Sequence, residues 1–130
     1  MFVNLRDKVL AYLYDKKSAT VEEIANDLKE DSDYVQATLR VLENEKLVRK
    51  SEKGLIKKRT IYELTPSGLV EAEKAYEKVK EKANELQQII QEEGEIPEDY
   101  VDLLPLLMTL SLIETMMLED MLLFDIFNNM

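Results

Sequence analysis

The sequence predicts a mainly α-helical fold with one small β-hairpin. Three observations carry this prediction. Apolar residues recur at helical spacing through most of the chain, one short segment alternates with period two around a glycine, and the 130 residues include only three Gly and three Pro. Because 45% of the residues are hydrophobic, the chain can form a core, and its length favours one domain or one small domain with an appendage.

Three short amphipathic helices are expected before residue 47. The first covers residues 4–16. The second begins at Thr20, which with Glu23 has the capping-box spacing, in which each side chain binds a backbone N–H at the helix start. The third begins after Asp31 or Ser32 as its N-cap. Their apolar residues recur three or four apart and give each helix one buried face: Leu5, Val9, Leu10 and Leu13; Ile24, Ala25 and Leu28; Val35, Leu39 and Leu42.

A β-hairpin is expected next. Leu47-Val48 begins its first strand, and residues 60–64 have the β-branched and aromatic alternation of a return strand. Gly54 lies between them and supplies the turn. Thr65 is then expected to cap a new helix, with Pro66 at the first helical position.

The second half of the chain predicts long helices. Over residues 66–93 apolar side chains are spaced alternately three and four apart, as in a coiled coil, and Gly94 is a plausible C-cap. Residues 98–127 are apolar around the whole helix circumference, so that helix should be buried on most sides. We therefore expect residues 66–130 to form a helical dimerisation region, with contacts from Leu69, Tyr76, Val79, Leu86, Ile90, Leu107, Leu110, Met117, Met121 and Phe124.

The order of three short helices, a hairpin and a helix is that of a winged helix-turn-helix. Two pieces are more specific: L-x-x-L-E-x-x-x-L-V from residue 39 and Y-x-L-T-x-x-G from residue 62. With them, roughly residues 18–82 resemble the DNA-binding core of the MarR-like and PadR-like transcriptional regulators. The resemblance implies a winged helix-turn-helix DNA-binding domain over residues 1–65. Its third helix, residues 32–46, would read the major groove, and its basic wing, residues 49–59, would bind phosphates or the minor groove.

The sequence also departs from the MarR-like pattern. MarR-like proteins generally have Gly just before the first strand of the wing, where this chain has Glu45-Lys46. They also tend to carry an extra N-terminal helix, for which the few residues before residue 4 leave no room. In this respect the chain is closer to PadR-like proteins, in which dimerisation lies C-terminal to the wing.

Charge is distributed unevenly along the chain. The formal net charge is −10, yet residues 1–82 carry all 17 Lys/Arg and 16 Asp/Glu, while residues 83–130 carry 11 Asp/Glu and no Lys/Arg. From Lys46 to Arg59 there are seven basic residues against one acid, Glu52. Lysines on a hairpin also protect a solvated sheet edge from aggregation. Their position directly after a helix-turn-helix instead favours contacts to DNA phosphates.

The residue types of the third helix suit base recognition. Gln can pair with adenine, Arg with guanine, and Ala can pack against a thymine methyl group. Asp33 opposes close phosphate contact at the start of this helix. The predicted DNA-binding residues are Ser32, Tyr34, Gln36, Ala37, Arg40, Lys50, Lys53, Lys57, Lys58 and Arg59.

Other classes of function are less compatible with the sequence. Without Cys or His the chain lacks the commonest nucleophile, general base and metal ligands, so we expect no enzyme activity, no metal site and no cofactor. The acidic pairs Glu92/Glu93 and Glu119/Asp120 have no basic partner nearby in the sequence. We therefore expect a sequence-specific, dimeric transcriptional regulator that binds double-stranded DNA.

Two alternatives stay open at this point. The chain could be a protein-interaction adaptor that binds a partner through its acidic, apolar C-terminal helix, or an architectural DNA binder without sequence preference. A membrane span over residues 101–127 is disfavoured, because each of its acids would cost roughly 2.5–3.5 kcal/mol near the bilayer centre. The N-terminal segment has no signal-peptide pattern, so a cytoplasmic location is expected.

Overall fold

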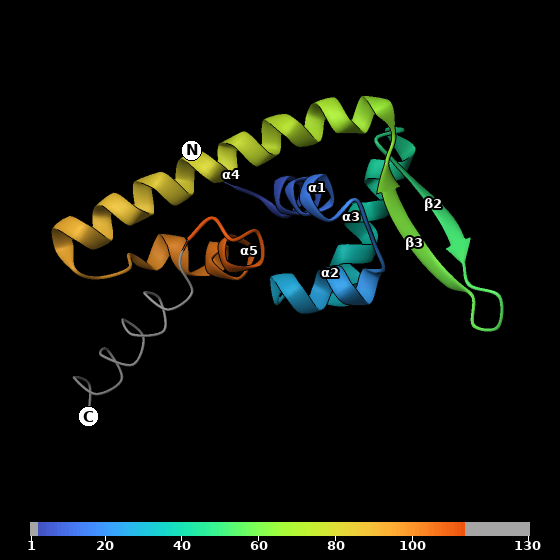
Figure 1. Cartoon of the computed structure of the whole chain (residues 1–130), viewed down its shortest axis with the longest axis horizontal. Helices are drawn as coiled ribbons and strands as arrows, with labels where there is room; N and C mark the ends of the chain where they lie inside the picture. Colours follow the sequence, from blue (N-terminus) through green and yellow to red (C-terminus); the bar gives the residue numbers. More distant parts are fainter. Residues whose placement is uncertain (1–2, 114–130) are drawn as a thin grey trace. The chain divides into compact units, whose positions relative to one another are not determined.

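The computed structural model describes residues 3–113. The chain divides after Val79 into two compact units, and one long helix runs through both. The prediction of a mainly helical fold with a small sheet is confirmed. The elements, labelled in Figure 1 where there is room, are α1 (Leu5–Lys16), β1 (Ser18–Ala19), α2 (Val21–Leu28), α3 (Ser32–Asn44), β2 (Val48–Lys53), β3 (Arg59–Leu64), α4 (Pro66–Glu93), the 3₁₀ helix η1 (Glu98–Leu103) and α5 (Leu104–Thr109).

The first unit is built on the three predicted short helices. Their expected apolar faces are buried, apart from Leu5, which is half-buried. The capping box of α2 is formed, since the Thr20 hydroxyl accepts a hydrogen bond from the Glu23 N–H at 3.1 Å and Glu23 accepts one from the Thr20 N–H at 3.4 Å. Asp31 is the N-cap of α3, as one of the two predicted alternatives had it.

The sheet has three antiparallel strands in the order β1-β3-β2, so it contains one strand more than the predicted hairpin. In the hairpin, Val48 pairs with Leu64 and Lys53 with Arg59. The additional strand, β1, pairs Ala19 with Tyr62. Two residues have no periodicity of their own, so this strand depends on the exposed edge of β3 for its formation.

Helix α3 ends at Asn44, two residues before the predicted end at residue 46. The reason is a left-handed residue, Lys46, with φ of 63°. The Lys46 N–H donates to the Glu43 carbonyl and the Leu47 N–H to the Leu42 carbonyl, which is the Schellman arrangement at a helix C-terminus. Glycine is the usual residue at the left-handed position because it has no Cβ. This is the place where the sequence differs from the MarR-like pattern.

We expect Lys46→Gly to raise the free energy of unfolding by about 0.5–1 kcal/mol, because a non-glycine residue is strained at positive φ. Urea unfolding followed by circular dichroism measures this change. Lys46→Ala is the matched control, since it removes the same charge and keeps the Cβ. Equal stability changes in the two variants would contradict the left-handed strain as the cause.

A compact junction joins α3, β2 and α4. The Thr65 hydroxyl donates to the Lys46 carbonyl at 2.7 Å and accepts from the Gly68 N–H at 3.0 Å, while the Thr65 N–H donates to the Leu47 carbonyl. Thr65 is thus the N-cap predicted for α4, and Pro66 is its first helical residue. The T-x-x-G pattern therefore fixes the start of α4 against the end of α3.

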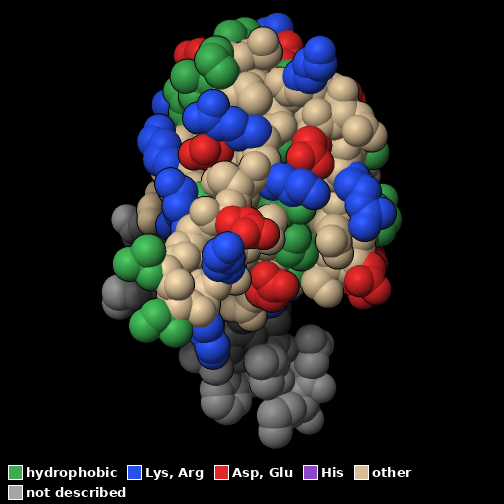
Figure 2. All heavy atoms as spheres, turned by 90° about the vertical axis from the view of Figure 1, so that its right-hand side faces the viewer, with side chains coloured by type: hydrophobic (Ala, Val, Ile, Leu, Met, Phe, Trp, Pro, Cys, Tyr) green, Lys and Arg blue, Asp and Glu red, His purple; other side chains and the backbone are tan. Residues whose placement is uncertain are grey.

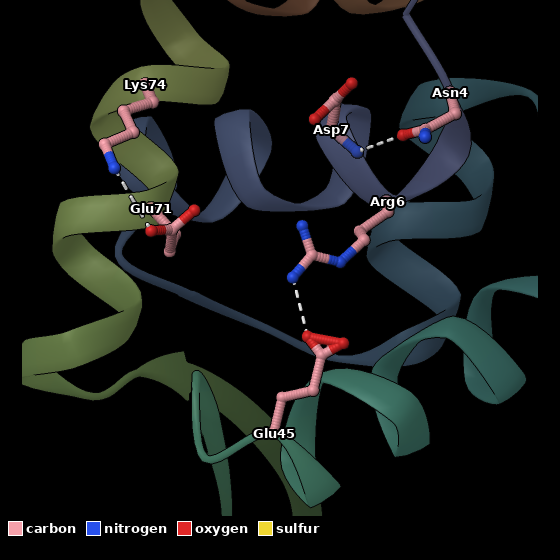
Figure 3. Close-up of polar contacts among 6 residues, drawn as sticks. All are labelled: Asn4, Arg6, Asp7, Glu45, Glu71 and Lys74. Carbon is pink, nitrogen blue, oxygen red and sulfur yellow. Dashed lines mark hydrogen bonds and ion pairs between the residues drawn. The ribbon is translucent and has the colours of Figure 1, made fainter.

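Polar contacts also connect the helices of the first unit. Arg6 at the start of α1 forms an ion pair of 2.6 Å with Glu45, just beyond the end of α3 (Figure 3). In α1 and α4, Asp7 and Lys78 form an ion pair of 3.1 Å, and the rings of Tyr14 and Tyr76 lie 5.1 Å apart. The ion pair and the ring contact therefore join α1 to α4 in addition to the apolar contacts between the two helices.

The second unit contains the C-terminal part of α4, η1 and α5. Tyr100 in η1 donates a hydrogen bond of 2.9 Å to Glu85, and the Gln87 amide donates one of 3.4 Å to the Leu112 carbonyl. Lys82 also donates a hydrogen bond of 3.0 Å to Glu85. The two hydrogen bonds lower the pKa of the Glu85 carboxyl, and the one from Lys82 has the larger effect. These contacts place η1 and the segment that follows α5 against α4.

The expectation of one helix over residues 98–127 is wrong for its described part. Residues 98–103 form a 3₁₀ helix, residues 104–109 a short α-helix, and Ser111 is left-handed with φ of 57°. Pro105 explains the first break, because it has no N–H to donate and its ring clashes with the carbonyl four residues earlier in a continuous α-helix. The remainder of the predicted helix, with Met117, Met121 and Phe124, lies outside the described residues.

The residues predicted to form a dimer interface lie in different environments. Leu69 is exposed, and Tyr76 is half-buried against Tyr14. The others in the described range are buried within the single chain: Val79, Leu86, Ile90, Leu107 and Leu110. Their role between protomers, and the division into a DNA-binding domain and a dimerisation region at residue 65, stay predictions. Of the helices in residues 3–113, none has the length and apolar character that a membrane crossing requires.

Candidate nucleic-acid interface

Helix α3 presents a polar face to solvent. Its buried side consists of Val35, Leu39 and Leu42, which pack into the first unit. The opposite positions are exposed, and because Ser32, Gln36 and Arg40 are four residues apart, they form one row along the helix. Tyr34 and Ala37, the other two residues predicted to reach base edges, are exposed beside this row. All five therefore remain free to contact a ligand.

The start of α3 carries two carboxylates with different roles. Asp31 accepts hydrogen bonds from the backbone N–H groups of Asp33 and Tyr34, at 2.9 and 3.1 Å. The negative charge of Asp31 therefore lies at the positive, N-terminal end of the helix dipole, where it is stabilising. Asp33 is exposed and adds negative charge at this end, which disfavours phosphate contacts there. The bases are best approached by residues further along the helix, beginning at Gln36.

The hairpin formed by β2 and β3 is strongly basic. Of its cations, Arg49 is neutralised by an ion pair of 3.0 Å with Glu63 on the facing strand. The remaining five are exposed and have no carboxylate within 4.0 Å among residues 3–113: Lys50, Lys53, Lys57, Lys58 and Arg59. Figure 2 shows Lys and Arg side chains spread over the side of the molecule on which the hairpin lies in Figure 1. This distribution favours an anionic ligand.

A cleft of about 720 Å³ lies between α3 and the hairpin. Gln36 from α3 and Lys50, Lys58 and Arg59 from the hairpin line it together. The cleft thus unites a side chain suited to base recognition with three cations suited to phosphates. The other predicted DNA-binding residues lie outside its lining, on the exposed surface of α3 or on the hairpin: Ser32, Tyr34, Ala37, Arg40, Lys53 and Lys57.

The sequence did not predict the remaining wall of this cleft. It consists of residues from β1–α2 and from β3: Thr20, Val21, Glu22, Glu23, Thr60 and Tyr62. Pairing of Ala19 with Tyr62 brings the start of α2 beside the hairpin. The capping box in the sequence predicts where α2 begins. Only the pairing of β1 with β3 shows that the start of α2 lies beside the hairpin. The two glutamates bring negative charge to this wall, so phosphates are better placed along the cations of the hairpin.

Gly54 determines how the hairpin turns. It has φ of 112°, and a Cβ at this position would lie 2.2 Å from the Lys57 carbonyl oxygen. Only glycine combines this backbone conformation with this close approach. The residue therefore fixes the turn that holds Lys53 and Lys57 at the end of the strands.

The described residues contain no cluster of metal ligands. Among residues 3–113, no group of three or more Asp or Glu side chains is arranged to hold a metal ion. The one buried side-chain oxygen without a hydrogen-bond partner in this range is Ser51 Oγ, in β2. Ser51 pairs with Ile61 on the facing strand.

The fold is similar to that of several solved structures, although the sequences are only distantly related. No family model matches the sequence, and no curated protein matches it. Solved structures that match include a transcriptional regulator homologue from Pyrococcus horikoshii, with 24% identity, a TM-score of 0.52, and coverage of 63% of this chain and 82% of that one. The adhesin competence repressor AdcR from Streptococcus pyogenes has 16% identity, a TM-score of 0.60 and coverage of 69% and 67%.

A variant of ZitR from Lactococcus lactis matches similarly, with 17% identity, a TM-score of 0.60, and coverage of 69% of this chain and 62% of that one. The matched structures share the winged helix-turn-helix fold of MarR-family transcriptional regulators. At these identities the likeness shows a shared fold. The predicted resemblance to winged-helix regulators is therefore confirmed at the level of the fold.

Proposed function

From the winged-helix fold and the basic cleft, we propose that this protein is a transcriptional regulator that binds double-stranded DNA as a homodimer. Helix α3 enters the major groove, and the hairpin lies along phosphates or the neighbouring minor groove. A protein with this function acts where the chromosome is, so we propose a cytoplasmic location in a prokaryotic cell. The matched structures support the proposal, because proteins with this fold include repressors.

The single observation that carries the proposal is the cleft between α3 and the hairpin. Gln36 faces the same space as Lys50, Lys58 and Arg59. A hydrogen-bonding side chain on an exposed helix is suited to base edges, and unpaired cations beside it are suited to the sugar–phosphate backbone. Phosphate contacts give affinity and register, whereas base contacts give sequence discrimination.

We propose that two copies of the chain read two half-sites separated by about one helical turn, roughly 34–36 Å. A symmetric dimer would present two α3 helices and two hairpins to one face of the duplex. Exposed apolar residues at the start of α4, Leu69 and Val70, offer contact area for a second copy. Light scattering after size-exclusion chromatography measures the assembly directly, and a monomeric mass would contradict a dimer.

Fluorescence anisotropy tests the proposed function. The labelled duplexes are the DNA upstream of the protein's own coding sequence and a scrambled duplex of equal composition. We expect tighter binding to the upstream duplex. Equal binding to both would indicate an architectural DNA binder, and no binding to either at low salt would contradict the proposal and favour an adaptor.

Arg40→Ala is expected to reduce discrimination between the two duplexes. A bidentate contact from Arg to guanine contributes about 1–3 kcal/mol of discrimination, so the ratio of the two dissociation constants should fall by about five- to 150-fold. Lys80→Ala is the matched control, because it removes an exposed cation from the C-terminal part of α4. An unchanged ratio in Arg40→Ala would show that Arg40 does not read bases.

A further inference from the structure

Two aliphatic residues at the end of the hairpin are fully exposed. The exposed fractions of Leu55 and Ile56 are 102% and 99%, whereas the other exposed large hydrophobic residues in the described range lie between 47% and 63%. Single apolar side chains on a surface are common and require no explanation. Two adjacent ones at the end of a hairpin instead form one contiguous apolar tip.

Cations surround this apolar tip. Lys53 precedes the turn, and Lys57, Lys58 and Arg59 follow it, all of them exposed. None of the four has a carboxylate within 4.0 Å among the residues that the structure describes. An apolar pair with cations on both sides is complementary to a polyanion that also offers an apolar surface. Double-stranded DNA has both, in its phosphates and in its stacked bases.

The length of the hairpin suits a particular place on DNA. Strands β2 and β3 are paired at six positions, from Val48↔Leu64 to Lys53↔Arg59. At a rise of about 3.3 Å per residue, the paired strands extend about 17 Å from the base of the hairpin, and the tip lies just beyond their end. Half a turn of B-DNA is also about 17 Å, which is the axial distance between the major groove and the adjacent minor groove. With α3 in the major groove and the hairpin running along the DNA axis, the end of the strands would reach the neighbouring minor groove.

We propose that Leu55 and Ile56 form a wedge that inserts from the minor groove into a flexible base step and kinks the DNA there. This inference rests on the proposed DNA binding. It adds that the protein also recognises how easily a base step can be deformed. Leu and Ile are among the side chains that partially unstack base steps when they enter the minor groove. Steps of the type TA are the easiest to deform, so such a site is selected without hydrogen bonds to its bases. The neighbouring cations hold the phosphates on both sides.

The test compares the wild-type chain with the double variant Leu55→Ala/Ile56→Ala on duplexes of about 30 base pairs that carry 2-aminopurine in a central TA step or in an A-tract. We expect the wild type to raise the 2-aminopurine fluorescence in the TA duplex, because the base becomes unstacked. The double variant should lose this rise and bind the TA duplex about tenfold more weakly. Its salt dependence should be unchanged, since no charge is removed.

Lys57→Ala is the matched control. It should lower the magnitude of the salt slope by about one and keep the fluorescence rise. Both aliphatic side chains are exposed, so the double variant should retain its unfolding midpoint, which circular dichroism checks. Wild-type binding without a fluorescence rise, or equal binding by the double variant, would overturn the wedge alone.

The other outcomes separate the wedge from its premise. If the wild type binds no duplex at low salt, the proposed function and the wedge both fail. Vesicles of phosphatidylcholine with one-quarter phosphatidylglycerol are the second probe, because an apolar tip flanked by cations also suits an anionic membrane surface. Vesicle binding that is lost in the double variant, together with DNA binding that is unaffected, would overturn the wedge in favour of a lipid contact.

Discussion

Replacing Lys57, Lys58 and Arg59 together by Ala is expected to weaken binding of every duplex about 100-fold at about 0.15 M salt. The three side chains are exposed and have no carboxylate partner among residues 3–113. If each binds one phosphate, each releases close to one counterion and contributes roughly fivefold at this salt concentration. The effect should be nearly independent of DNA sequence, because phosphates carry no sequence information.

Anisotropy titrations at several salt concentrations measure this effect. We expect the slope of log K against log[salt] to become less steep by about three in the triple variant. The control variant Lys74→Ala/Lys80→Ala removes exposed cations from α4. It should leave the slope unchanged. If the triple variant kept the wild-type slope, the hairpin would not bind phosphates.

Gly68→Ala is expected to lower the free energy of unfolding by about 3 kcal/mol or more, although Ala normally favours a helix. A Cβ at this position would lie 1.7 Å from the Leu47 carbonyl oxygen. That oxygen also accepts the Thr65 N–H at 3.0 Å, so it cannot move without breaking the junction between α3, β2 and α4. The substitution therefore forces α4 away from the end of α3.

Gly94→Ala is the matched control for this effect. Gly94 has φ of 72°, but a Cβ there would meet no atom within 4 Å. Only backbone strain opposes this substitution, so its cost should be about 1 kcal/mol. Urea unfolding followed by circular dichroism compares the two variants. Equal costs would show that the close approach of Gly68 to Leu47 does not determine stability.

The helices of the first unit could be predicted because their signals are local. The Thr20/Glu23 capping box and the Thr65-Pro66 helix start each depend on residues within one helical turn. The buried residues of α3 likewise follow from spacing alone. Each signal reflects hydrogen bonds or packing that form within a short stretch, so no knowledge of distant residues was needed.

Features that depend on distant residues were not predicted. Strand β1 exists because Ala19 meets Tyr62, which is far away in the sequence. That pairing brings the start of α2 into the cleft wall, so Glu22 and Glu23 were not recognised as neighbours of the basic hairpin. The end of α3 at Asn44 was not predicted for another reason. Lys46 occupies the left-handed position after the helix, where a glycine would have indicated the boundary.

The C-terminal part shows the limit of periodicity as a signal. The three-four spacing over residues 66–93 correctly predicts a helix and its apolar side. It does not identify what covers that side, and Leu86 and Ile90 are buried within the chain itself. Beyond Gly94, high hydrophobicity suggested one helix, whereas Pro105 divides residues 98–109 into two short ones. The high hydrophobicity of this segment predicts that it is buried, whereas Pro105 determines where the helix is interrupted.

The predicted interface of α3 and the hairpin is tested most directly by mapping it with the full chain in solution. Backbone amide chemical shifts of isotope-labelled protein are recorded by NMR with and without the upstream duplex. We expect the largest changes in residues 32–40 and 48–60, with much smaller changes in residues 80–113. Changes centred on residues 80–113, or no changes at a duplex concentration that saturates anisotropy, would contradict DNA binding by this cleft.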